Sequence, residues 1–476
     1  RLERDLRKNL GDAADNIGEN PKAITSFLEN DAIFENLIVQ RSRAYAVESQ
    51  IKEHGEATAF PKRQKPKVAE YSIFKTYGSL LSLIERAFSR SSPLFSLVVY
   101  NPVEYYLGDA DEIDSFHKAR LRSVVTLIRT QFLKRFESSV YAFETSCDRL
   151  LRKLLAFLTI HCKTDHEKQL LARWIAQNES LLAYSSKKQS DLWGNDEENN
   201  PELFPEELLA WWDKLERDKY DVPAIIDMTL LDLNELVKFL EETRKFKSEK
   251  DDKLNKLKRM LQSKEFNEKK VIIFTEFADT ARYLEKNLKE VGIKGLARID
   301  GGSSGTRYDA VQRFAPYYNS TSSAGLIENG LKEIRVLIAT DVLSEGLNLQ
   351  DSSRLINYDI HWNPVRLMQR IGRIDRRMDP KVEAILKQDH PNLESDRGKV
   401  SFWNFLPPNE LNTLLSLYST VTRKTLLISE TMGIEGRKLL TPEDEYDALR
   451  EFNAGYEGER SLVESLQLEL QELLKN

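Results

Sequence analysis

Arginine side chains gather in one short stretch of the chain, LMQRIGRIDRR, which runs from Leu367 to Arg377. A solvated helix face normally mixes in lysine and several carboxylates, but this stretch holds no lysine and one aspartate. A guanidinium group stays protonated and presents a planar fork of donors that matches phosphate oxygens. Arg370, Arg373 and Arg376 are three residues apart, so on a helix they would lie on one face. Two interpretations are open: a phosphate-binding surface, and a basic surface helix that pairs with nearby carboxylates, which three arginines by themselves favour.

Short apolar runs alternate with helical patterns around the arginine stretch. The runs are VIIFT, GLARID, IRVLIATD, RLINYD and KVSFWNFL, and the helical patterns cover residues 278–289, 308–314 and 365–371. Strands separated by helices of this length pair in parallel through right-handed crossovers, which predicts an α/β, doubly wound parallel sheet. Such sheets bind ligands beyond the carboxyl ends of their strands. The residues at these ends are Thr275, Asp300, Gly301, Thr340, Asp341 and 359–362.

The chain upstream of this sheet is mostly helical in pattern. Apolar residues recur at threes and fours between 116 and 158, which predicts one long amphipathic helix or a helical hairpin. The outer face near its start is basic, through Lys118, Arg120, Arg122, Arg129, Lys134 and Arg135. This face is either a solvated helix surface or a phosphate contact. FPKRQKPKVAEYS is predicted to be extended around its prolines, and SPLFSLVVYNPVEYY is ambiguous between strand and helix.

Composition excludes several classes of protein. The 476 residues carry a net charge of -6, so binding to a polyanion would depend on a local basic patch. The two cysteines make neither a disulfide framework nor a zinc site, and the six histidines lack the spacing of metal ligands, so we predict no metal site. No apolar stretch approaches the roughly 18 residues of a membrane helix. We expect a cytoplasmic protein without a membrane partner.

Four segments in a fixed order carry a family resemblance. VIIFTEF, RIDGGSSGTRYDAVQRFA, VLIATDVLSEGLNLQ and NYDIHWNPVRLMQRIGRIDR resemble motifs IV, IVa, V and VI of superfamily 2 helicases. Within that superfamily they are most similar to the Swi/Snf group, on the bacterial RapA-like branch. The resemblance covers about residues 253–377 and implies a RecA-like lobe of an ATP-dependent translocase on double-stranded DNA.

The resemblance also implies roles for particular residues. It assigns Arg373 and Arg376 to the γ-phosphate of ATP, as arginine fingers. Further contacts with ATP are implied for Gly346, Asn348, Gln369 and Arg370. Contacts with the nucleic-acid backbone are implied for Thr275, Gly301, Arg307 and Thr340. The Swi/Snf group continues with Ile-Gly-Gln after the second finger, whereas this chain has Arg377, Met378 and Asp379, which argues against a chromatin role.

The chain lacks a motif that hydrolysis needs. A P-loop reads GxxxxGK[ST] and cradles the phosphates, but the one Gly–Lys pair, Gly398 and Lys399, has neither the upstream glycine nor a following Ser or Thr. Asp111 and Glu112 follow no apolar strand and are interpreted as a loop. We expect the ATP-binding lobe and the Mg²⁺ ligands upstream of a chain that begins without Met, and no ATPase activity from these residues alone.

These patterns divide the chain into four predicted parts. They are the end of the first helicase lobe with a connecting segment (1–110), a helical insertion with an exposed loop near 185–205 (111–250), the RecA-like lobe (251–406) and a helical tail (407–476). Two other functions stay open: a non-catalytic nucleic-acid-binding or scaffold module, and a helicase subunit of a restriction or phage-defence system. Double-stranded DNA, the missing lobe, and RNA polymerase or defence proteins are the expected partners.

Overall fold

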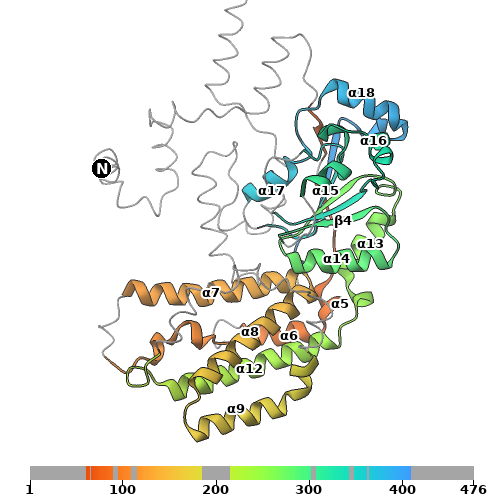
Figure 1. Cartoon of the computed structure of the whole chain (residues 1–476). Coiled ribbons are helices and arrows are strands. Elements are labelled where there is room, and N and C mark those ends of the chain that lie inside the picture. The colour runs from red at the N-terminus through yellow and green to blue at the C-terminus, as the bar shows by residue number, and fades with distance from the viewer. Residues whose placement is uncertain are drawn as a thin grey trace, which may run out of the picture.

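The computed structural model shows a parallel sheet beside a layer of long helices (Figure 1). It describes residues 60–64, 66–88, 95–108, 115–184, 215–301, 307–341, 348–361 and 364–408. The predictions for residues 1–59, for the loop near 185–205 and for the tail from 409 onward lie outside these ranges.

The sheet is parallel throughout, as the sequence predicted. Its central strands are β3 (Val271–Phe274), β4 (Leu296–Ile299), β5 (Val336–Ala339), β6 (Arg354–Asn357) and β7 (Lys399–Asn404). They lie in the order β7-β6-β3-β5-β4, with β1 outside β7, and each pairing is parallel. The strands β3, β5 and β6 are buried along their whole length. Burial explains why β3 and β5 are continuous apolar runs, whereas β6 places Leu355 and Ile356 between the buried polar residues Arg354 and Asn357.

Helices cover both faces of the sheet. They are α13 (Asp252–Gln262), α14 (Ala278–Glu290), α15 (Arg307–Phe314), α16 (Ser323–Glu328), α17 (Pro364–Ile371) and α18 (Pro380–Asp389). Ile273 of β3 belongs to one core cluster with Leu284 of α14, whereas its neighbour Ile272 belongs to another with Val311 of α15. Successive side chains of a strand point to opposite faces, so the two clusters are the two sides of a doubly wound sheet. The predicted α/β class with a doubly wound parallel sheet is confirmed.

An extended segment completes one edge of the sheet. We name it the strap: residues 60–64 and 66–72, with the strands β1 (Lys62–Arg63) and β2 (Lys67–Val68). Both strands pair in parallel with β7. Pro61 and Pro66 offer no backbone N–H, and the lysines add charge, so the strap forms an edge that resists further strand pairing. The extended segment predicted from FPKRQKPKVAEYS is thus part of the sheet.

The helical layer, which we name the helical module, surrounds an aromatic core. Its helices are α5 (Ile73–Tyr77), α6 (Ser79–Ala87), α7 (Ser115–Ser138), α8 (Val140–His161), α9 (Asp165–Gln177) and α12 (Val222–Arg244). Phe143 of α8 contacts Phe132 and Phe136 of α7 and Phe239 of α12. The ambiguous stretch near residue 100 forms two short 3-10 helices, η2 (Val98–Tyr100) and η3 (Pro102–Tyr105).

The long helical pattern from 116 to 158 is two helices rather than one. Ser139 lies between α7 and α8 in an extended conformation, and its hydroxyl accepts from the backbone N–H of Ala142 at 3.1 Å. A serine in this position caps the second helix, so the chain turns there and α7 packs beside α8 (Figure 1). The hairpin alternative is therefore the correct one.

No helix among the described residues has the length and apolar character needed to span a membrane. Both cysteines, Cys147 and Cys162, are free thiols and buried.

Candidate functional site

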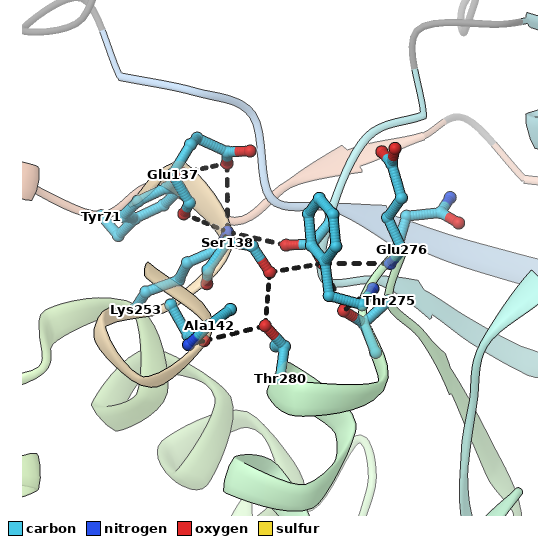
Figure 2. A network of polar contacts seen from close by, with 12 residues as sticks. Tyr71, Glu137, Ser138, Ala142, Lys253, Thr275, Glu276 and Thr280 are labelled. Carbon is cyan, nitrogen blue, oxygen red and sulfur yellow. Dashed lines mark hydrogen bonds and ion pairs between the residues drawn. The ribbon is translucent and has the colours of Figure 1, made fainter. Parts of the chain in front are cut away.

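A buried carboxylate, Asp359, organises the carboxyl edge of the sheet. It follows β6, and its Oδ2 accepts from the hydroxyls of Ser138, at 2.8 Å, and Thr275, and from the backbone N–H of Glu276 at 3.2 Å. Its Oδ1 accepts from Lys253 Nζ at 3.1 Å. Figure 2 shows four of its partners, Ser138, Lys253, Thr275 and Glu276, which come from helices and from the end of β3. Asp359 therefore ties the end of β3 and the helical module to the end of β6.

Lys253, at the start of α13, bridges two buried carboxylates. Its Nζ lies 3.0 Å from Oε1 of Glu137 and 3.1 Å from Oδ1 of Asp359. Burial opposes its charge, but the carboxylates of Glu137 and Asp359 outweigh burial and raise the pKa of Lys253. Tyr71 of the strap donates to Glu137 at 2.7 Å, and burial followed by that carboxylate raises the pKa of Tyr71 well above 10. At neutral pH the cluster thus contains a lysine cation and a neutral tyrosine, because the pKa of each is raised. Figure 2 shows Lys253 and Tyr71 beside Glu137.

Hydroxyl groups extend this cluster into the helical module. Thr280 Oγ1 on α14 lies 2.6 Å from the Ser138 hydroxyl and 2.8 Å from that of Ser139 (Figure 2). The junction between α7 and α8 is therefore hydrogen-bonded to the first turn of α14, directly beside Asp359. A continuous polar network in a buried setting holds its members in one arrangement when each is satisfied.

Arg370 braces the ends of two strands from α17. Its Nε and Nη2 donate to both carboxylate oxygens of Asp341, at 2.6 and 2.7 Å, and its Nη1 donates to the carbonyl of Asp359 at 2.8 Å. The guanidinium lies over the ring of Phe274, 5.5 Å from its centre. A bidentate arginine–carboxylate pair of this kind is strong and directional. Since Arg370 is 2% exposed, it is placed to position α17 rather than to reach a ligand.

The two expected finger residues lie just after α17, in a segment that we name the arginine loop (residues 372–377). Arg376 Nη1 donates to Oδ1 of Asn348 at 2.6 Å, and its Nε donates to the carbonyl of Gly372 at 3.0 Å. The backbone N–H of Leu349 donates to the carbonyl of Arg373 at 3.3 Å. These bonds hold the arginine loop against residues 348–350, the segment that follows β5.

The strap holds the arginine loop from the other side. Asp375 lies between the two finger residues, and its buried carboxylate forms an ion pair with the guanidinium of Arg63 on β1. A further bond, from Gln350 Nε2 to the carbonyl of Arg377 at 2.9 Å, fixes the end of the loop. The loop is therefore supported by a strand-end segment and by an edge strand.

The remaining predicted site residues are spread around the carboxyl edge. Gln369 is exposed on α17, Gly301 is exposed after β4, and Arg307 begins α15 with an exposed side chain. Thr340 follows β5 and is 4% exposed, and its hydroxyl has no hydrogen-bond partner among the described residues. Gly346 lies outside the described residues.

Thr275 is placed differently from a surface contact. It is fully buried, and its hydroxyl donates to Asp359. The sequence locates it correctly at the end of β3 but carries no sign of this internal partner.

The basic face of α7 is largely committed to internal partners. Arg135 donates to Asp279 at 2.9 Å, Lys134 to Glu276 at 3.0 Å, and Arg129 Nε to the carbonyl of Phe95 at 3.0 Å. The first two pairs join the helical module to the segment after β3. These contacts favour the structural interpretation of the face over a phosphate contact, while the side chains of Lys118 and Arg120 are not described.

Several important residues were missed by sequence reasoning. Lys253, Glu137, Arg63 and Asp375 act through partners more than 100 residues away in the chain. No local pattern marks them. Among the described residues, no group of three or more His, Cys, Asp or Glu is arranged to hold a metal ion.

Known protein families and relatives match the part of the chain that forms the sheet and the arginine loop. Residues 252–378 match the helicase conserved C-terminal domain. The ATP-dependent helicase YqhH of Bacillus subtilis is 40% identical over 107 residues, which cover 22% of this chain and 16% of that protein. The putative ATP-dependent DNA helicase fml2 of Schizosaccharomyces pombe is 30% identical over 149 residues, 29% of this chain and 17% of that protein. The RNA polymerase-associated protein RapA of Sodalis glossinidius is 34% identical over 113 residues, 24% of this chain and 10% of that protein.

Residues 252–378 therefore form a helicase conserved C-terminal domain. Its relatives include Swi/Snf-like proteins, as the motifs indicated. The chain spans less than a fifth of the length of the three relatives above. Among solved structures, the C-terminal part of the Fun30 ATPase domain aligns over 87% of this chain and 98% of its own, at 12% identity and a TM-score of 0.33, which supports no further conclusion.

Proposed function

We propose that this chain is the C-terminal part of an ATP-dependent translocase on double-stranded DNA, of the Swi/Snf-like group. The observation that carries the proposal is the arginine loop at the carboxyl edge of the sheet. Arg376 bonds to Asn348, and the carbonyl of Arg373, a residue that is 7% exposed, accepts from the backbone N–H of Leu349. ATP is the substrate, and Arg373 and Arg376 would stabilise the charge that develops on its γ-phosphate. Such a contribution is worth about 10³ to 10⁵ in rate in other phosphoryl-transfer enzymes.

Arg370 has a supporting part in this proposal. Its bonds to Asp341 and to the Asp359 carbonyl set the direction in which α17 leaves the sheet. Asn348 would orient Arg376 through the bond to its Nη1, and Gln369 and Gly346 complete the proposed contacts with ATP. The P-loop and the Mg²⁺ ligands belong to a separate lobe in this proposal, so the described lobe supplies only one wall of the ATP site.

The proposed nucleic-acid track lies beyond β4 and β5. Gly301 and Arg307 are exposed at the end of β4 and the start of α15, where a backbone N–H and a cationic side chain suit phosphate oxygens. Thr340 has a hydroxyl without a partner among the described residues. Thr275 would act indirectly, because its hydroxyl is used by Asp359. Phosphate contacts carry no sequence information, which suits movement along any duplex.

The wider assignment follows the four predicted parts. We propose that residues 1–110 end the first lobe and connect it to the second, that 111–250 are an insertion, that 251–406 are the RecA-like lobe and that 407–476 are a helical tail. A cytoplasmic location and an association with RNA polymerase or with defence proteins belong to the same proposal.

The test is turnover in the full-length protein. Arg373→Ala should lower kcat for ATP by about 10³ or more, because a charge-stabilising group is lost from the transition state. Affinity for duplex DNA, and its dependence on salt, should stay unchanged. Arg366→Ala is the matched control, since Arg366 is an exposed arginine of α17 outside the arginine loop. The proposal fails if Arg373→Ala hydrolyses ATP normally, or if it loses DNA binding instead of turnover.

A second measurement tests whether ATP hydrolysis requires a separate lobe that carries the P-loop. The 476-residue chain alone should hydrolyse ATP no faster than buffer, because it lacks a P-loop. Mixing it with a P-loop lobe in trans, or joining the two, should restore turnover. Hydrolysis at helicase rates by the chain alone would contradict the proposed division between lobes.

A further inference from the structure

The strap reaches the arginine loop from outside the lobe that contains it. It precedes the helical module in sequence, yet β1 pairs with β7, and Arg63 of β1 pairs with Asp375 of the loop. The two residues are 312 apart in the chain. Arg63 lies outside the four segments that resemble helicase motifs, yet it contacts the segment between the two proposed fingers.

The burial of Asp375 explains why the pair with Arg63 matters. Its side chain is fully buried, so its charge needs a partner, and Arg63, with a side chain 20% exposed, supplies one. On the opposite side, the loop is bonded to Asn348, Leu349 and Gln350. A short loop that carries three arginines, two of them the proposed fingers, is therefore held between an anchor after β5 and an anchor on β1.

The strap itself is fixed at both of its ends. Backbone bonds join Lys62 to Gly398 and Ala69 to Asn404, at 2.8 and 2.9 Å. Tyr71 then enters the buried cluster through its bond to Glu137 (Figure 2). These bonds fix which residue of β7 lies beside Arg63. A displacement of the strap would therefore also displace Asp375.

We infer that Arg63 is a positioning residue for the two arginine fingers, acting through Asp375. The inference rests on the proposed function of Arg373 and Arg376. Arg63 touches neither ATP nor DNA in this account; it sets the place from which Arg373 and Arg376 extend. The proposed function assigns the residues that lead into the strap to the end of the ATP-binding lobe. A movement of that lobe would therefore shift the strap, and the strap would shift Arg373 and Arg376.

The experiment compares variants of the full-length protein in DNA-stimulated ATP hydrolysis. Arg63→Ala should lower kcat by about 10- to 100-fold, since a misplacement of about 1 Å can cost that much in rate. KM for ATP should change less than about threefold, because the fingers act on the transition state rather than on binding. Lys67→Ala is the matched control: it removes another cation of the strap, one that pairs with the exposed Glu265, and should leave kcat unchanged.

A charge exchange and a local probe distinguish positioning from simple loss of structure. The double variant Arg63→Asp, Asp375→Arg restores an ion pair between the two positions. Its kcat should be at least about tenfold higher than that of Arg63→Ala. Amide hydrogen exchange in residues 372–377 should rise about tenfold or more in Arg63→Ala, while exchange in β3 stays unchanged. Normal kcat in Arg63→Ala, or exchange that rises equally across the sheet, overturns the inference.

The outcome for Arg373→Ala separates the two proposals. If Arg373→Ala loses turnover and Arg63→Ala does not, the inference alone fails. If Arg373→Ala keeps its turnover, the proposed function fails, and any effect of Arg63→Ala then has another cause.

Discussion

The sheet lobe and the helical module use buried charge in different ways. At the carboxyl edge of the sheet, Asp359 and Arg370 are buried to organise strand ends and to aim a helix. Inside the helical module, Asp232 and Glu167 are buried to fix the module's own loops and helix starts. Buried charge in the lobe therefore joins strand ends to a helix, whereas buried charge in the module secures the module's own loops and helix starts.

Lys253, where the two regions meet, should show the largest effect on stability. Lys253→Met leaves Glu137 and Asp359 buried without their cation, and breaking a buried pair in this way costs about 3–5 kcal/mol. Urea unfolding of the chain would measure this loss. Lys256→Met, on the same helix, serves as the control and should change the free energy of unfolding by less than about 1 kcal/mol. Equal losses in the two variants would show that the buried ion pairs of Lys253 contribute no more to stability than another lysine of α13.

Glu167, within the module, should show a smaller effect that depends on pH. A hydrogen bond from Arg217, together with backbone donors from Thr164 and Lys163, lowers the pKa of Glu167 to about 2. A carboxyl group whose pKa is lowered in the folded state stabilises the fold at any pH above its pKa in the unfolded chain. This stabilisation is lost as the pH falls toward 2. Glu167→Gln should therefore cost about 2 kcal/mol at pH 7, with the difference from wild type shrinking below about pH 4. Unfolding free energies from pH 3 to 7 test this; a difference that grows in acid would contradict it.

Asp232 should show the opposite dependence on pH in the same module. Burial raises its pKa to about 6, although the backbone N–H groups of Ser96 and Leu97 donate to its carboxylate. A raised carboxyl pKa means that the folded state holds the proton more tightly, so stability falls as the pH rises from about 4 to 6. Relative to Asp232→Asn, the wild type should lose about 2 kcal/mol across this range. A flat difference would show that the carboxylate is as well solvated when folded as when unfolded.

A surface pair of the module should show the smallest effect. Lys245 pairs with Glu242 at the end of α12, where the lysine side chain is 69% exposed. Exposed pairs of this spacing contribute a few tenths of a kcal/mol, so Lys245→Ala should change the free energy of unfolding by less than about 0.5 kcal/mol. Thermal unfolding at low and high salt measures the pair. A loss above 1 kcal/mol would mean that exposed charges of the module matter as much as buried ones.

The sequence predicted the sheet lobe better than it predicted the helical module or the site. The buried strands β3 and β5 are unbroken apolar runs, and β6 has the apolar centre Leu355 and Ile356, so these strands were predicted from the sequence. The six-residue α16 was missed because so short a helix has almost no period. The helix α18 was also missed, although Asp379 and Pro380 form a recognisable helix start.

The candidate site divides in the same way. The motif order led to Arg376 and Asn348, which the structure brings together at 2.6 Å. The partners that hold this arrangement, Arg63 and Lys253, belong to other parts of the chain and have no local signature. Long-range polar pairs depend on how helices and strands pack together. Local sequence patterns do not specify this packing.

The pairing of the strap with β7 has a consequence for how the protein is made. The strap is the earliest described strand segment to leave the ribosome, and β7 is the latest of the described strands. During synthesis the strap must wait, with its hydrogen-bonding groups satisfied by water, until most of the polypeptide has emerged. The edge of the sheet is therefore completed late, and a chain truncated before residue 399 would expose both the strap and β6 to unwanted association with other strands.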